Sequence, residues 1–190
     1  MKVGLFFGSF NPVHTGHLFI ANHMAHYTNL DEVWLVVSPQ NPFKNKAGLL
    51  SEYDRLHLVN IAIEDNDKLR ACDIEFNLPK PSYTIDTLVY LKEKYPGYEF
   101  SLIMGGDNLP TLHKWKNADV LIKDYTIYVY NRSGTNLDEK KYAENIKILE
   151  TPQILLSASY IREQLKDNKP ITYLVPKEVE RYIKEMGWYK

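Results

Sequence analysis

The sequence lacks several features that would place a protein in a specialised class. Cys72 is the single cysteine among 190 residues, which excludes an internal disulfide and a cysteine-rich zinc site. No apolar run approaches the ~18 residues that a membrane-spanning helix requires, and no basic segment leads into a long apolar one. A formal net charge of −1 gives no overall field that would attract nucleic acid or a membrane surface. We therefore expect a cytoplasmic protein without nucleic-acid or membrane partners, in which any anion site is built locally.

Strand-like and helix-like patterns alternate along the chain. Hydrophobic residues make up 44% and charged residues 25% of the sequence, which is enough for one sizeable core. Short apolar runs predict buried strands at 3–7, 33–37, within 69–76, 100–104, 125–130 and 146–149. Helical spacing and capping residues predict helices at 18–25, from 51, from 84 to the Pro-Gly pair at 96–97, and at 109–115, 159–166 and 176–186. The alternation predicts one domain over residues 1–190, of α/β class, with a Rossmann-like, doubly wound parallel sheet and C-terminal helices.

A turn rich in glycine, asparagine and proline, GSFNPVHTGH at residues 8–17, connects the first strand to the first helix. Turns at this place bind phosphates in open α/β folds. On a helical wheel His17 lies on the apolar face, beside the carboxyl ends of the strands, whereas His23 and His26 face solvent. Backbone N–H groups at a helix start, together with the imidazoles of His14 and His17, favour a polyphosphate ligand over a sugar or an acid. The alternatives are a core histidine bonded to a carbonyl, or a metal site, for which no third ligand stands at suitable spacing.

The 8–17 stretch resembles the T/HxGH motif of the nucleotidyltransferase superfamily, including the G-x-F-x-P segment that precedes it. In that superfamily the two histidines stabilise the transition state at the α-phosphate of a nucleoside triphosphate, so the resemblance gives these roles to His14 and His17. Further along the chain, LSASYIR at 156–162 resembles the ISSTxIR motif of adenylyltransferases, whose hydroxyls and arginine hold the ATP phosphates at a helix start. Ser159 and Arg162 would take these roles. The structural alternative is a plain N-cap at Ser159, with Arg162 on a solvated face.

Three further segments resemble those of nicotinate-nucleotide adenylyltransferases. KPSYTIDTL at 80–88 is similar to their (R/K)xSYTxDT segment, GGDNL at 105–109 with a later tryptophan to their GxDxL…W segment, and PQNPFK at 39–44 to their P-x-x-P-H/F-K loop. In that family a Tyr/Thr segment and the tryptophan hold the pyridine carboxylate, the aspartate contacts ribose, and the loop lysine approaches phosphate. The resemblance implies a mononucleotide site made of Asn11, Lys44, Tyr83, Thr84 and Trp115.

The resemblance also implies an ATP site, in which the two histidines and the arginine are catalytic. Its predicted members are Gly8, Ser9, Phe10, His14, His17, Gly105, Asp107, Ser159, Ile161 and Arg162. Structural alternatives stand beside four of the implied roles. These are a helix cap for Thr84 and for Asp107, a core position for Trp115, and a solvated surface position for Lys44.

The function that the resemblance implies is adenylyl transfer from ATP to nicotinate mononucleotide, giving nicotinate adenine dinucleotide and pyrophosphate in NAD biosynthesis. In-line attack by the mononucleotide phosphate needs no protein nucleophile, because phosphoryl transfer relies on positioning and charge stabilisation. Mg²⁺ would be carried with the ATP phosphates, and no protein metal site is expected. The alternatives are the same chemistry on nicotinamide mononucleotide or phosphopantetheine, and a non-catalytic nucleotide sensor.

Overall fold

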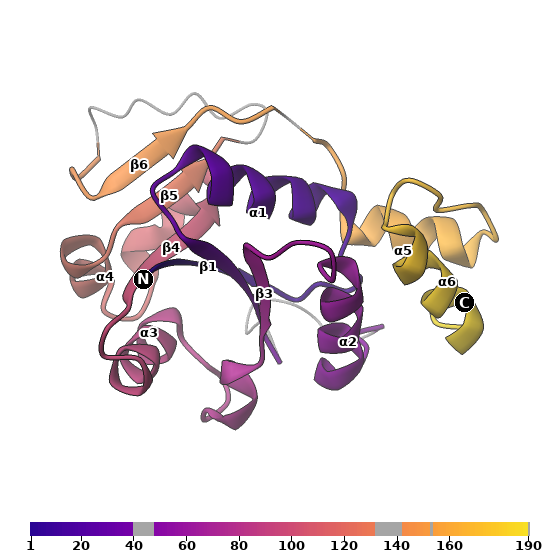
Figure 1. Ribbon diagram of the computed structural model, residues 1–190, viewed down its shortest axis with the longest axis horizontal. Coiled ribbons are helices and arrows are strands. Elements are labelled where there is room, and N and C mark those ends of the chain that lie inside the picture. The colour runs from indigo at the N-terminus through magenta and orange to yellow at the C-terminus, as the bar shows by residue number, and fades with distance from the viewer. Residues whose placement is uncertain (40–47, 132–141, 153, 190) are drawn as a thin grey trace.

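Six parallel strands form one sheet (Figure 1) in the part of the chain that the structure, a computed structural model, describes: residues 1–39, 48–131, 142–152 and 154–189. The strands are β1 (Lys2–Gly8), β2 (Glu32–Val37), β3 (Leu69–Cys72), β4 (Glu99–Gly105), β5 (Ile127–Tyr130) and β6 (Ile146–Leu149). Their order across the sheet is β3-β2-β1-β4-β5-β6. The strand order therefore reverses between β1 and β4, which makes the carboxyl ends of these two strands a topological switch point.

Helices cover both faces of this sheet. The α-helices are α1 (Thr15–Tyr27), α2 (Glu52–Ala62), α3 (Thr84–Lys94), α4 (Ala118–Asp124), α5 (Ala158–Lys166) and α6 (Lys177–Met186), and the 3₁₀ helices are η1 (Ile74–Asn77) and η2 (Gly106–Lys114). α1 and α2 pack on one face, and α3 and α4 on the other (Figure 1). α5 and α6 stand to the side of these layers, where α6 packs against α2.

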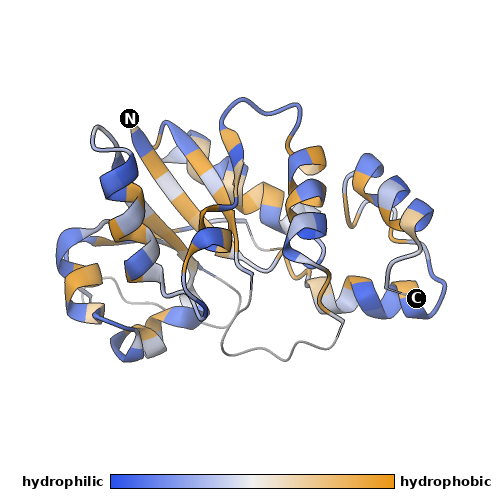
Figure 2. Cartoon of the chain, turned by 90° about the horizontal axis from the view of Figure 1, so that it is seen from below, coloured by the Kyte–Doolittle hydropathy of each residue, from blue (hydrophilic) through white to orange (hydrophobic). Residues whose placement is uncertain are grey.

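Side chains of β1 alternate between two cores. Val3 and Leu5 are fully buried and cluster with Leu88 of α3, whereas Phe6 clusters with Met24 of α1. Figure 2 shows hydrophobic residues along the strands in the middle of the molecule. A sheet covered on both faces buries both sets of side chains, which is why its strands read as continuous apolar runs in the sequence.

The predicted fold class, an α/β Rossmann-like sheet with C-terminal helices, is confirmed. The capped helix expected from residue 51 is α2, whose N-cap Ser51 accepts a hydrogen bond from the Asp54 N–H at 3.1 Å. The helix expected at 176–186 is α6, which ends at Gly187 with a φ of 66°. That left-handed conformation is the one for which glycine is favoured just beyond a helix.

The segment between β4 and β5 differs from the sequence-based expectation. The helix expected at 109–115 is the 3₁₀ helix η2, which begins earlier, at Gly106. The helix α4 was not predicted, and because it extends to Asp124, β5 begins at Ile127 instead of at 125. α4 has only seven residues, too few for an amphipathic repeat to stand out, and it starts from Asn117 in a left-handed conformation, with a φ of 50°.

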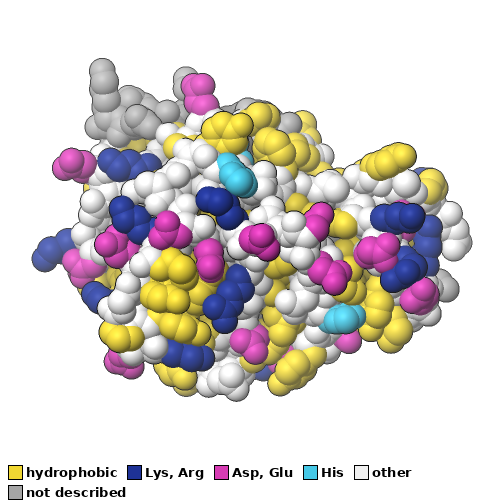
Figure 3. Space-filling view, in the orientation of Figure 1, with side chains coloured by type: hydrophobic (Ala, Val, Ile, Leu, Met, Phe, Trp, Pro, Cys, Tyr) yellow, Lys and Arg dark blue, Asp and Glu magenta, His cyan; other side chains and the backbone are white. Residues whose placement is uncertain are grey.

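Two surface properties complete the description. Within the described residues, no helix has both the length and the apolar character needed to cross a bilayer. On the face drawn in Figure 3, basic and acidic side chains are interspersed.

Candidate active site

The candidate site lies at the switch point of the sheet. Gly8 ends β1 and leads into the 8–17 turn, and Gly105 ends β4 and leads into η2. The two strands are paired directly, with Phe6 opposite Ile103. In open parallel sheets the crevice outside the carboxyl ends at a switch point is where ligands bind. Two of the predicted ligand segments, about a hundred residues apart in the sequence, therefore lie next to one another.

His14 and His17 begin α1 with a reciprocal pair of hydrogen bonds. The Nδ1 atom of His14, the N-cap, accepts from the His17 N–H at 3.3 Å, and the Nδ1 atom of His17 accepts from the His14 N–H at 3.3 Å. The rings stack with centroids 3.6 Å apart and planes 23° apart. Because each Nδ1 accepts a hydrogen bond through its lone pair, a neutral ring carries its proton on Nε2. The pair thus holds two Nε2–H donors in a fixed tautomer, which suits charge stabilisation on a phosphate.

The surroundings of the two rings match the helical-wheel prediction for α1. His17 meets Phe10 and Phe6 edge-on, at centroid distances of 5.0 and 6.1 Å, so it lies on the inner side of the helix. His26 is exposed, and His23 is half-buried and stacked on the exposed Tyr27. Only the two histidines of the motif therefore belong to the switch-point end of α1.

Two glycines and a phenylalanine shape the turn before α1. Phe10 is 1% exposed with a φ of 45°, and a Cβ on Gly8 would lie 2.8–3.0 Å from its ring. A Cβ on Gly16 would lie 3.1 Å from the ring of His14. The side chain of Phe10 belongs to the core and its main chain lies along the turn, so its predicted contact with ATP, which stays a prediction, would be made by the main chain. Gly8 and Ser9 are half-buried and stay predicted ATP ligands.

Asn11 connects the turn to the rest of the protein. Its Nδ2 donates to the Gly48 carbonyl at 2.9 Å, and its Oδ1 accepts from the Tyr189 hydroxyl at 2.7 Å and from the Leu50 N–H at 3.3 Å. The residue is 5% exposed. The amide of Asn11 is thus engaged with three protein groups and fixes the turn, and its predicted contact with the mononucleotide stays a prediction.

Arg162 joins the second predicted phosphate motif to the first. Its Nη1 donates to the main-chain carbonyl of Asn11 at 2.7 Å, across 151 residues of sequence, and its Nη2 donates to the Ser159 hydroxyl at 3.2 Å. The N-cap of α5 is Ser157, whose Oγ accepts from the Tyr160 N–H, so the capping alternative for Ser159 is wrong. The guanidinium thus lies at the turn that leads into the histidine pair.

Ile161, also predicted to contact ATP, points the other way. Its side chain is fully buried in the α1/α2 core, and its N–H donates to the Ser157 carbonyl at 3.2 Å within the helix. The side chain of Ile161 therefore anchors α5 to the core, and the predicted contact of this residue with ATP stays a prediction. Its helical neighbours Ser159 and Arg162 remain the predicted ligands from this motif.

Arg55 is a buried residue of the site that the sequence reading missed. Its guanidinium donates to four main-chain carbonyls, those of Ser9 at 2.6 Å, Ser38 at 2.8 Å, Leu50 at 3.0 Å and Pro39 at 3.1 Å. Burial lowers the pKa of Arg55, although a guanidinium stays protonated at neutral pH. The residue holds together the loops after β1 and β2. The sequence signal that could have revealed its burial is its helical spacing, because Arg55 lies three residues before Leu58 and thus on the buried face of α2.

The start of α3 and the residues after η2 form a second part of the site. Tyr83 is the N-cap of α3 without a side-chain capping bond, so the alternative that Thr84 caps this helix is wrong. The Lys116 ammonium lies 4.9 Å from the centroid of the Tyr83 ring and pairs with Asp86 at 2.8 Å. Trp115, the neighbour of Lys116, is half-buried. It packs against the core under α3 and against a further apolar cluster that includes Leu112 of η2. The structure therefore brings Tyr83, Thr84 and Trp115 into one neighbourhood.

Glu75 lies beneath this second part and was also missed. It is 3% exposed, and its Oε1 accepts from the Thr87 hydroxyl of α3 at 2.9 Å. Burial raises the pKa of the Glu75 carboxyl, against the opposing effect of hydrogen bonds with Thr87, Ser38 and Ser82. Ser38 follows β2 and Ser82 precedes α3, so this carboxyl connects the loop that Arg55 holds to the segment around Tyr83.

Three predicted residues remain to be placed. Asp107 is exposed in the first turn of η2, whose N-cap is Gly105, so the capping alternative for Asp107 is wrong. Gly105 is buried, and the near ring atoms of Tyr130 lie 3.3 Å from where its Cβ would be. Lys44 falls outside the described residues, and its predicted approach to phosphate stays a prediction.

Comparison with known proteins identifies the family. The cytidylyltransferase-like family model matches residues 5–164. The "Probable nicotinate-nucleotide adenylyltransferase" of Flavobacterium psychrophilum is 51% identical over 192 residues, covering all of both chains. The protein of the same name from Cytophaga hutchinsonii is 52% identical, covering all of this chain and 98% of its own. The chain belongs to the nicotinate-nucleotide adenylyltransferase family.

Solved structures confirm the fold of this adenylyltransferase. The Plasmodium falciparum nicotinic acid mononucleotide adenylyltransferase complexed with NaAD superimposes with a TM-score of 0.83 at 20% identity, covering 99% of this chain and 97% of that one. The same enzyme complexed with APC gives a TM-score of 0.81 at 19% identity, with coverage of 99% and 96%. The architecture is therefore shared over nearly the whole length of both proteins.

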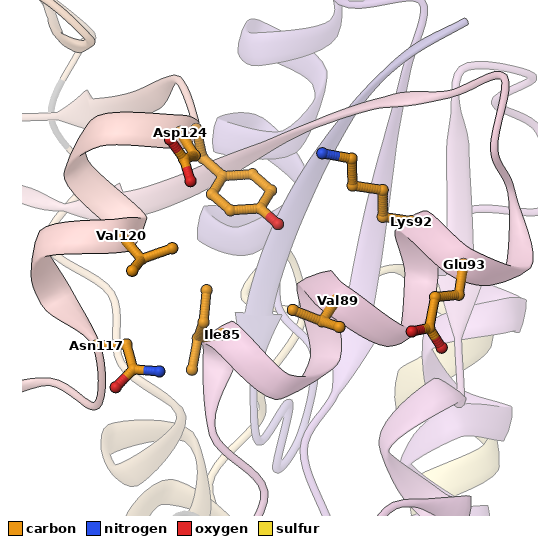
Figure 4. A pocket seen from close by; sticks show the side chains of 8 residues that line it. Ile85, Val89, Lys92, Glu93, Asn117, Val120 and Asp124 are labelled. Carbon is orange, nitrogen blue, oxygen red and sulfur yellow. The ribbon is translucent and has the colours of Figure 1, made fainter.

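A shallow groove of about 500 Å³ lies between α3 and α4 of the adenylyltransferase (Figure 4). Ile85 and Val89 of α3 line it together with Val120 of α4, and charged groups such as Lys92 and Asp124 stand at its sides. None of the residues predicted to bind ATP or the mononucleotide lines it. The groove therefore plays no part in the assignment of function.

Proposed function

We propose that the chain transfers the adenylyl group of ATP to nicotinate mononucleotide, giving nicotinate adenine dinucleotide and pyrophosphate in NAD biosynthesis. The single observation that carries the proposal is the contact of Arg162 with the Asn11 carbonyl. It brings the two phosphate motifs together in a chain about half identical, along its whole length, to relatives of that name. Residues 1–190 would form one nucleotidyltransferase domain, which would work in the cytoplasm.

The proposed reaction is a direct in-line displacement at the α-phosphorus. An oxygen of the mononucleotide phosphate forms the new bond to that phosphorus, and the bond to the leaving pyrophosphate breaks. The Nε2–H donors of His14 and His17 and the guanidinium of Arg162 stabilise the charge that spreads over the phosphate oxygens in the transition state. No side chain needs to become covalently attached to the substrate.

Mg²⁺ belongs to this proposal as part of the ATP complex. Among the described residues, no group of three histidine, cysteine, aspartate or glutamate side chains is arranged to hold a metal ion. Mg²⁺ usually keeps several waters and binds through substrate phosphates, so we expect it to stay mainly on the triphosphate. When bound, the cation would neutralise triphosphate charge, while the chain's own donors at the start of α1 and at Arg162 orient the phosphates.

The start of α3 would hold the pyridine carboxylate. A helix start attracts anions through its N–H groups and its dipole, and no side chain caps α3 at Tyr83. The Lys116 ammonium lies beside the Tyr83 ring, but its charge is paired with Asp86 in the first turn of α3, so the N–H groups of the helix start supply the main attraction. Trp115 would stack on the pyridine ring. A carboxylate fits these groups better than an amide, because the amide carries no charge.

Turnover with three acceptors tests this proposal. Purified protein is supplied with ATP and, separately, nicotinate mononucleotide, nicotinamide mononucleotide and phosphopantetheine, and pyrophosphate and the dinucleotide product are measured. We expect kcat/KM to be at least about tenfold higher for nicotinate mononucleotide than for either competitor. A preference for another acceptor would overturn the substrate assignment, and absence of pyrophosphate with all three would favour a nucleotide sensor.

A further inference from the structure

The residues that follow α6 return to the phosphate-binding turn. After Gly187 ends the helix, Trp188 and Tyr189 pack against the α1/α2 core. The Tyr189 hydroxyl donates to the Oδ1 atom of Asn11 at 2.7 Å, across 178 residues of sequence. Tyr189 adopts a φ of 65°, which costs free energy for a residue with a bulky side chain. A strained aromatic residue is thus held with its hydroxyl on a residue of the turn.

Asn11 connects Tyr189 to Arg162, because Tyr189 contacts its side chain and Arg162 contacts its main chain. Asn11 offers its main-chain carbonyl to the Arg162 guanidinium, and its side chain is fixed by Tyr189, Gly48 and Leu50. The contact with Leu50 is long, at 3.3 Å, so the phenol supplies the short hydrogen bond to this oxygen. Loss of the phenol would leave the amide with one short bond, from its Nδ2 to Gly48, and the long one from Leu50, so Asn11 would be held less firmly.

The hydroxyl of Tyr189 acts as a neutral donor. Burial raises the pKa of Tyr189 well above its ordinary value, although the nearby guanidinium groups of Arg162 and Arg55 oppose that rise and the carboxylate of Asp54 adds to it. The phenol therefore keeps its proton at neutral pH. Its contribution is one hydrogen bond of fixed direction, which phenylalanine cannot make.

We propose that Tyr189 is a positioning residue for ATP, acting through Asn11 to set the carbonyl that orients the Arg162 guanidinium at the phosphate-binding turn. This inference rests on the proposed function, because it assigns Arg162 to the ATP phosphates. The relevant ligand is the triphosphate of ATP, and the mononucleotide site at α3 lies outside the contact chain. A change at Tyr189 should therefore alter ATP binding and leave binding of the mononucleotide unchanged.

Tyr189→Phe tests the inference, because it removes the hydroxyl and keeps the ring in the core. We expect the KM for ATP to rise about fivefold to tenfold, with the KM for the mononucleotide nearly unchanged and the Tm lowered by no more than about 2–4 °C, as for the loss of one hydrogen bond within the protein. Tyr182→Phe is the matched control, because this half-buried tyrosine on α6 packs against Trp188 and contacts His57 instead of the turn. An unchanged KM for ATP in Tyr189→Phe, or equal rises in both KM values with a lowered Tm, would overturn the inference.

A double-mutant cycle separates action through Arg162 from a general effect. In an Arg162→Lys background, Tyr189→Phe should weaken ATP binding by less than twofold, because the guanidinium that it positions is gone. Affinity is measured by calorimetry with a non-hydrolysable ATP analogue, which requires no acceptor. If the wild-type protein bound the analogue but produced no dinucleotide, the proposed function would fail while the cycle still tested Tyr189. Equal weakening in both backgrounds would contradict positioning through Arg162.

Discussion

Replacement of Arg55 by lysine tests whether a single buried guanidinium holds the loops of the site in place. The arginine is fully buried and donates to the carbonyls of Ser9, Ser38, Pro39 and Leu50. A lysine ammonium keeps the charge, but it has a single nitrogen and cannot reproduce the planar fork that reaches all four oxygens. At least two of the four bonds should therefore be lost, and the carbonyls that made them would remain buried.

The expected loss of folding stability follows from the number of hydrogen bonds lost. A hydrogen bond to a charged group contributes about 1.5–3 kcal/mol, so the loss of two bonds lowers the free energy of unfolding by about 3–6 kcal/mol. For a chain of this length that corresponds to a fall in Tm of about 6–24 °C. The loss is a large fraction of the ~5–15 kcal/mol that keeps a typical domain folded.

Urea denaturation followed by circular dichroism measures this effect. The matched control is Arg181→Lys on α6, an exposed arginine paired with Glu178 and Glu185, for which a change within about 0.5 kcal/mol is expected. If Arg55→Lys lost less than about 1 kcal/mol, similar to the control, the buried guanidinium would not be the group that holds these loops, and the reasoning would be refuted.

The other two predictions concern Glu75 and Arg162. Burial raises the pKa of Glu75 in the folded state, so the wild type loses stability as the pH rises from below the ordinary value of about 4.3 through that raised pKa. Glu75→Gln should therefore gain stability relative to the wild type between pH 4 and pH 8. A difference in the free energy of unfolding that did not change with pH, measured by urea denaturation, would contradict this. Arg162→Lys keeps the charge but loses the two-point contact with Asn11 and Ser159. ATP affinity measured by calorimetry should fall about tenfold, and unchanged affinity would remove Arg162 from the phosphate site.

The parts of the structure that the sequence predicts are those set by local pattern. The strands of a doubly covered sheet are continuous apolar runs, so β1, β2, β4 and β6 can be read within two residues of their ends. The cap at Ser51 and the stop at Gly187 are side-chain and backbone preferences of single positions. The 8–17 turn likewise carries its chemistry in consecutive residues, which is why the histidine pair could be predicted.

The parts that the sequence does not predict depend on contacts between distant segments. Arg55 resembles any charged residue of an amphipathic helix until the loops after β1 and β2 are seen to converge on it. Glu75 is buried only because Ser38, Ser82 and Thr87 surround it. Asn11 was predicted to face a ligand, and its engagement by Tyr189 depends on a segment 178 residues away. Tertiary contacts of this kind leave no periodic trace in the sequence.

Turnover of His17→Ala is the most direct test of the central claim, that two imidazoles at the start of α1 stabilise the transition state of adenylyl transfer. Pyrophosphate release with ATP and nicotinate mononucleotide should fall by about 10²–10³ in kcat, the cost of losing one transition-state donor, while calorimetry still detects ATP binding. Circular dichroism of the variant, with His26→Ala as the exposed control on the same helix, verifies that α1 is intact. A kcat near that of the wild type in His17→Ala would contradict the account.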